Sequence, residues 1–215
     1  ETAHPTVPLP VTLGQVFDVD AVLVTLTPPD QWDEAARTLL SKDLPVYAQN
    51  ERDAADIREA GFLDVRVLGE RTDFAGVTLS KTVGRHGSAQ VLARYGAVLG
   101  EVCGIVFQHP QEKTLYLAGD TVWYEEVAAT LERHRPEVII VNCGDARLLG
   151  DQPIIMNEQD LLLLAAAAPR ATIMASHLEA VNHASVTRAH LRAVLAEHGL
   201  SDRVLVPADG ETIVC

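Results

Sequence analysis

Three side chains that can bind metals or move protons stand out in this chain of 215 residues: His86, Asp120 and His177. Each follows closely on a run of β-branched residues of the kind that forms a strand. Loops at the carboxyl ends of strands bring distant residues together, so sheet proteins commonly place ligand sites there. Because two imidazoles and a carboxylate suit a divalent metal such as zinc or manganese, these residues indicate a metal site.

Each of these residues also has a purely structural interpretation. Asp120 is placed to cap a helix that begins near Trp123, a position where aspartate is favoured. His86 and His177 could equally be hydrogen-bonded loop histidines. His183 lies nearer to a helix start than to a strand end. The other histidines are typical of surface or helix-face positions; they are His4, His109, His134, His190 and His198. Spacing alone leaves both interpretations open.

The elements that must position these residues alternate along the chain. Short β-branched runs predict strands over Ala21–Thr25, Val46–Ala48, Val65–Leu68, Val77–Thr82, Val102–Phe107, Thr114–Ala118, Val138–Val141, Thr172–Ala175 and Val204–Val206. Amphipathic segments predict helices over Trp32–Leu40, Glu51–Ala60, Trp123–His134, Glu158–Ala168 and Ser185–His198. Between Phe74 and Leu117 strands are expected to follow one another without a helix. We therefore predict one α/β domain over residues 1–215, with a mixed sheet and flanking helices rather than a Rossmann or barrel fold.

Composition and charge exclude several classes of protein. Hydrophobic residues make up 47% and charged residues 22%, which is typical of a soluble globular protein and not of a disordered one. The net charge of −13 argues against nucleic-acid binding. The longest apolar run, Leu161–Ala168, is too short to cross a bilayer, so we expect no membrane association. Three widely spaced cysteines and the lack of an apolar leader favour a cytoplasmic protein.

Missing motifs narrow the reaction classes further. The sequence has no Gly-x-Gly-x-x-Gly, no phosphate-binding Gly-Lys-Ser/Thr loop, no Gly-x-Ser-x-Gly elbow and no His-Glu-x-x-His. This argues against nucleotide kinases, dinucleotide oxidoreductases, serine hydrolases and helical zinc proteases.

Several segments, in order, resemble the metallo-β-lactamase superfamily, and above all the sugar-lactonase-like branch related to the ascorbate-6-phosphate lactonases. The resemblance runs from Val19 to Cys215 and is carried by Asp20–Thr25, Pro29–Asp33, Pro45–Asn50, Gly84–Gly87, Tyr116–Tyr124, His177–His183 and Pro207–Glu211. It implies an αββα sandwich of the metallo-β-lactamase type, with mixed sheets, flanking helices and a site at one edge of the two sheets. It also implies metal-dependent hydrolysis of a lactone, ester or phosphodiester.

The loop after the first predicted strand departs from that family. The family binds two metals through a His-x-His-x-Asp-His loop, and here Leu26, Pro28 and Gln31 stand at its three histidine positions, while Asp30 matches. The side chains of leucine and proline have no lone pair for a metal. A glutamine amide oxygen suits a hard cation better than zinc. We therefore predict that no dinuclear zinc site forms.

The resemblance implies that His86 and His177 serve different metals, that Asp120 bridges them, and that Asp30 is a proton acceptor or ligand. With the loop changed, we expect one divalent metal, zinc or manganese, or none. Two hypotheses follow: a hydrolase of reduced or one-metal activity, or a non-catalytic relative that binds a small molecule or a partner. The family's opening strands have no counterpart before Glu1, so we expect an upstream segment or a partner chain, such as a second copy, to cover the sheet.

Overall fold

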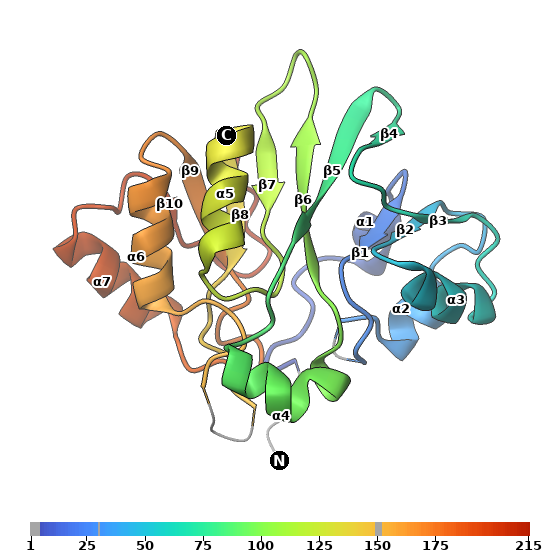
Figure 1. Cartoon of the computed structure of the whole chain (residues 1–215), viewed down its shortest axis with the longest axis horizontal. Helices are drawn as coiled ribbons and strands as arrows, with labels where there is room; N and C mark the ends of the chain where they lie inside the picture. The colour runs from blue at the N-terminus through green and yellow to red at the C-terminus, as the bar shows by residue number, and fades with distance from the viewer. Residues whose placement is uncertain (1–4, 30, 149–151) are drawn as a thin grey trace.

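The computed structural model describes residues 5–29, 31–148 and 152–215, and its strands form two sheets (Figure 1). The larger sheet has the order β10-β9-β8-β7-β6-β5-β4. Its strands are β4 (Thr72–Phe74), β5 (Val77–Val83), β6 (Cys103–Gln108), β7 (Leu115–Leu117), β8 (Val138–Asn142), β9 (Thr172–Ser176) and β10 (Val204–Leu205). Neighbours from β4 to β7 are antiparallel and those from β7 to β10 are parallel. The smaller sheet is parallel throughout and contains β1 (Val22–Val24), β2 (Val46–Ala48) and β3 (Val65–Val67).

Helices lie outside the two sheets (Figure 1). They are α1 (Leu13–Phe17), α2 (Glu34–Leu39), α3 (Glu51–Glu59), α4 (Ala89–Leu99), α5 (Glu125–His134), α6 (Glu158–Ala167) and α7 (Arg188–Glu197). In Figure 1, α5, α6 and α7 accompany the larger sheet, α2 and α3 accompany the smaller one, and α4 crosses below. Within the described ranges, no helix is long and apolar enough to span a membrane.

Alternation along the strands produces the layers, because successive side chains of a strand point to opposite faces. On β6, Val106 packs in the cluster that the larger sheet shares with α5, α6 and α7, whereas Ile105 packs toward the smaller sheet. On β2, Tyr47 meets Ile105 between the sheets, and Val46 and Ala48 pack against α3. Both sheets are therefore covered on both faces, and the predicted αββα sandwich is confirmed.

One prediction about the order of elements was wrong. The strands between Phe74 and Leu117 are interrupted by helix α4. The Ser88 hydroxyl accepts a hydrogen bond from the Val91 N–H at 3.3 Å and caps the first turn, and Gly100 ends the helix with φ +71°. Val91 and Leu99 are buried against the segment that follows β8. The helix is therefore supported by its Ser88 cap, by an amphipathic pattern as regular as that of α3, and by this tertiary contact.

Candidate active site

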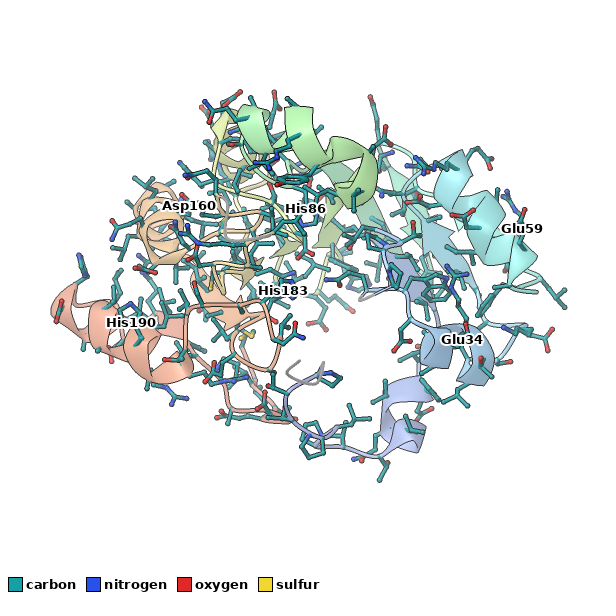
Figure 2. All side chains as sticks on the ribbon, turned by 90° about the horizontal axis from the view of Figure 1, so that it is seen from below. Glu34, Glu59, His86, Asp160, His183 and His190 are labelled. Carbon is teal, nitrogen blue, oxygen red and sulfur yellow. The ribbon has the colours of Figure 1, made fainter. Side chains whose placement is uncertain are left out.

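The three candidate residues come together at one cavity of about 580 Å³. His86 follows β5, Asp120 follows β7 and His177 follows β9, so all three stand at the same end of the larger sheet. His86 and Asp120 are only 6% and 3% exposed. His183 lines the same cavity, and Figure 2 shows His86 and His183 near the centre of the molecule, with His190 far out on α7.

Most of the cavity wall is apolar. Its aliphatic residues come from the loop after β1, the end of α4 and the segment after β8; they include Leu26, Pro28, Val98, Leu99, Leu148 and Ile154. Two of these, Leu26 and Pro28, are residues that the sequence resemblance aligns with imidazoles of the metallo-β-lactamase loop, and that alignment stays a prediction. The cavity therefore combines a carbon-lined wall with a polar end formed by His86, Asp120 and His177.

Backbone contacts hold the loops of His86 and Asp120 in a fixed relation. The Thr121 hydroxyl accepts a hydrogen bond from the Arg85 N–H at 2.9 Å, which ties the two loops together. Gly119 precedes Asp120 with φ +70°, and a Cβ there would lie 2.6 Å from a backbone oxygen of β6. Only glycine fits this close approach, so the turn that presents Asp120 is fixed by sequence.

The Asp120 carboxylate accepts hydrogen bonds from two amides. Gln31 Nε2 donates to Oδ2 at 3.0 Å, and Asn142 Nδ2 donates to Oδ1 at 2.6 Å. The helix that follows, α5, has Tyr124 as its N-cap residue and no side-chain cap. The interpretation of Asp120 as a helix cap is therefore wrong, and its side chain belongs to the cavity.

His177 is held by its backbone and by Gln31. Its φ of +56° lies in the left-handed region, which costs a non-glycine residue roughly 1–2 kcal/mol. Gly144 allows this turn, because a Cβ there would lie 2.0 Å from the His177 carbonyl oxygen. The His177 Nε2 atom lies 3.3 Å from Gln31 Nε2, and its ring packs edge-on against His183, with centroids 5.9 Å apart. Strain of this kind is typical of functional sites.

Several residues of the site were not identified from the sequence. Asn142 ends β8 and would have been found by applying the strand-end rule to one more strand. Arg147 lines the cavity and donates from Nε to Asp145 Oδ2 at 2.9 Å and from Nη2 to Oδ1 at 3.0 Å. Asp145 has φ +52° and also accepts a hydrogen bond from the Ser185 hydroxyl at 2.6 Å. No motif in the sequence signals this group of Asp145, Arg147 and Ser185.

Among the residues that the structure describes, the donor side chains do not complete a metal site. Within the described ranges, no three His, Cys, Asp or Glu side chains gather as a metal ion requires. His86 Nε2 and Asp120 Oδ2 lie 3.9 Å apart, a spacing that two bonds of about 2.1 Å could bridge. His177, however, reaches Asp120 through the amide of Gln31. Asp30 lies outside the described residues, so its role and the three-ligand set stay predictions.

Comparison with known proteins places the chain among sequence relatives, although no family model matches it. It is 42% identical over 210 residues to the UPF0173 protein YddR of Bacillus subtilis, which covers 97% of this chain and 82% of that protein. Isothiocyanate hydrolase from Delia radicum gut bacteria is 46% identical, with a TM-score of 0.95 over 99% of this chain and 82% of its own. A possible metal-dependent hydrolase from Veillonella parvula is 39% identical, with a TM-score of 0.94 over 98% of this chain and 82% of its own.

A more distant structure shares the fold alone. The metallo-β-lactamase-fold protein YhfI of Bacillus subtilis is 13% identical, with a TM-score of 0.66 over 91% of this chain and 78% of its own. The two-sheet sandwich described above is therefore the metallo-β-lactamase fold.

Proposed function

The chain belongs to the UPF0173 family, and from that premise we propose that it hydrolyses small apolar isothiocyanates, R–N=C=S. The observation that carries the proposal is the cavity, whose aliphatic wall ends at two imidazoles and a carboxylate. The 46% identical neighbour is named as an isothiocyanate hydrolase. A relative that matches 38% of the chain is named as a metal-dependent hydrolase, and the Veillonella parvula structure, which matches 98%, is named as a possible one. These names support hydrolysis as the reaction class and imply a divalent metal in the family.

The shape and chemistry of the cavity suit this substrate class. An apolar R group gains free energy when it leaves water for the wall formed by residues such as Leu26, Pro28 and Ile154. The N=C=S group carries no net charge and would point toward His86 and Asp120. Its central carbon is already strongly electrophilic, so the attack of water requires a positioned proton acceptor more than a strong Lewis acid.

The reaction assigned to the site balances without an added reactant. Water forms a C–O bond to the central carbon while one of its protons passes to His86 Nε2 and then to the substrate nitrogen. The product, R–NH–C(=S)–OH, breaks its C–N bond to give R–NH2 and O=C=S as its hydroxyl proton moves to nitrogen. We assign His86 as the proton acceptor because its Nε2 lies 3.9 Å from Asp120 Oδ2, so that one water molecule beside the pair could contact both atoms.

Asp120 orients that water. Each carboxylate oxygen has two lone pairs, and each accepts one amide hydrogen bond, so Oδ2 keeps capacity for a water proton. The amides of Gln31 and Asn142 fix the carboxylate from both sides. General base catalysis by a histidine in this position contributes about 10²–10⁴-fold to a rate.

The test measures release of benzylamine from benzyl isothiocyanate by the purified chain. We expect turnover by the wild type, and a loss of about 10²-fold or more in His86→Ala. His190→Ala is the matched control, because His190 lies on the outside of α7 and should keep wild-type turnover. A wild-type rate equal to that of buffer would refute the proposal. Lactones, esters and phosphodiesters, the classes expected from sequence, belong in the same panel.

A second candidate function is binding without turnover. It is favoured by the two amides on Asp120, since hydrogen bonds to both carboxylate oxygens are also what a purely structural aspartate makes. Phenylacetonitrile, an unreactive analogue of benzyl isothiocyanate, would then raise the melting temperature while no amine is released from the isothiocyanate.

A further inference from the structure

We propose that the amide of Gln31 takes the place of a metal ion in this site, joining Asp120 to His177 by hydrogen bonds and keeping a divalent cation out. Gln31 Nε2 lies 3.0 Å from Asp120 Oδ2 and 3.3 Å from His177 Nε2. One small group thus contacts two of the three side chains that the resemblance assigns to metals. The inference concerns the site of the proposed function, but it does not depend on the substrate.

The orientation of the amide follows from its partners. An ionised carboxylate only accepts hydrogen bonds, so the NH2 end of Gln31, and not its oxygen, faces Asp120. The second N–H is then directed to His177 Nε2, which accepts it and leaves the ring proton on Nδ1. A cation between Asp120 and His177 would meet the positive end of both N–H dipoles. Rotation of Gln31 would offer only an amide oxygen, which is a poor ligand for zinc.

The loop holds Gln31 at this point. The backbone N–H groups of Gln31 and Trp32 both donate to the Pro28 carbonyl oxygen at 2.9 Å, which closes a tight turn. Trp32 is 3% exposed and packs against Phe62 with ring centroids 5.5 Å apart. The backbone of residue 31 is therefore anchored to the core of the smaller sheet, while its side chain extends to residues of the larger sheet.

The other described residues of the loop offer no metal ligand to the cavity. The Thr27 hydroxyl donates to Asp53 Oδ1 at 3.2 Å, and Asp53 is a buried residue of α3, so Thr27 is directed away from the cavity. Leu26 and Pro28 face the cavity without a nitrogen or oxygen side-chain atom. Over residues 26–29 and 31, the described part of the loop, Gln31 is the residue whose side-chain polar atom reaches Asp120.

The experiment measures zinc binding by the full chain without substrate. Wild type, Gln31→Glu and Gln31→Ala are purified without chelator, dialysed against zinc chloride and analysed for bound zinc. Gln31→Glu replaces both N–H donors with a carboxylate, so we expect at least about tenfold tighter zinc binding than in the wild type, which corresponds to about 1.4 kcal/mol. Gln159→Glu makes the same change of charge at an exposed position of α6 and should bind zinc like the wild type.

Nitrogen NMR of the histidine rings detects the hydrogen bond between Gln31 and His177 directly. If Gln31 only supported the fold, its replacement would leave the His177 resonance unchanged. In the wild type, His177 should be the Nδ1–H tautomer, and Gln31→Ala should shift its Nε2 resonance, because the amide hydrogen bond is lost. One equivalent of zinc that stays on the wild type through dialysis would overturn the inference. Equal zinc affinity of wild type and Gln31→Glu, or an unmoved His177 resonance, would also overturn it.

Turnover measured on the same samples separates this inference from the proposed function. Turnover with bound zinc would leave the function standing and refute the role of Gln31. A wild type that shows neither turnover nor bound zinc would refute the proposed function and leave the role of Gln31 standing.

Discussion

The two sheets contribute unequal halves of the site. The larger sheet presents polar side chains at its strand ends, His86, Asp120 and His177. The loop that follows β1 of the smaller sheet presents Leu26 and Pro28, which form part of the apolar wall. The comparison shows that strand ends of one sheet supply the polar end of the cavity, while a loop of the other sheet supplies apolar side chains. The following substitutions test this division between a polar and an apolar half.

The largest effect is expected at Asp120 in the polar half. Asp120→Ala removes the acceptor for two amides and the group that orients the water, so turnover should fall by about 10²-fold or more. Because the Asn142 amide loses its partner, the free energy of unfolding should fall by about 1–3 kcal/mol. Kinetics and urea unfolding measure both effects. Asp202→Asn, at an exposed position, is the control, and wild-type turnover in Asp120→Ala would contradict the assignment.

The next effect is expected when three imidazoles are placed in the apolar half. The triple variant Leu26→His, Pro28→His, Gln31→His supplies three nitrogen donors. Its zinc content should rise from less than one ion per chain in the wild type to at least one ion per chain. Replacing the same three residues with alanine is the matched control and should add no zinc. Equal zinc content in both triple variants would mean that the loop does not set metal binding.

A smaller effect is expected from shortening the wall. Leu26 is 4% exposed and lines the cavity, so Leu26→Ala should lower kcat/KM for benzyl isothiocyanate by about tenfold and that for methyl isothiocyanate by less. Because the substitution leaves empty space around residue 26, the free energy of unfolding should also fall by about 2–5 kcal/mol. Leu163→Ala, at an exposed position of α6, should change neither. Equal losses on both substrates would show that Leu26 does not contact the R group.

The smallest effect concerns resistance of the protein to the proposed substrate class, since isothiocyanates also add to thiolates. Burial raises the pKa of the Cys103 and Cys143 thiols to about 12, so both remain protonated and unreactive near pH 8. Cys215 is exposed. Mass spectrometry after benzyl isothiocyanate treatment should find one modified cysteine, Cys215, and a Cys215→Ser variant should take up none. Modification of Cys143 would show that the core opens more readily than its burial indicates.

Most strands could be predicted from the sequence, because they are short runs of β-branched residues. The strand at Val46–Ala48 was predicted with its observed bounds, and its tyrosine lies between the sheets as alternation requires. Strand β4 and helices α1 and α4 were missed. Strand β4 has three residues and α1 has five, and α4 is stabilised by the Ser88 cap and by contacts with a distant segment.

The site was predictable only in part. Strand ends gave His86, Asp120 and His177, since topology brings such positions to one edge. The contact of Gln31 with Asp120 joins residues 89 positions apart and loops from different sheets, so no local pattern contains it. The capping interpretation of Asp120 failed for the same reason, because its partners lie on β8 and on the loop after β1.

One measurement tests the central claim. The claim is that His86 and Asp120 hydrolyse an apolar substrate in this cavity while the Gln31 amide takes the place of a metal ion. It is the turnover of benzyl isothiocyanate by wild-type protein whose zinc and manganese contents are determined on the same sample, before and after chelator treatment. We predict turnover at less than one ion per chain, unchanged by the chelator. Turnover that disappears with the chelator and returns in proportion to added zinc would contradict the account.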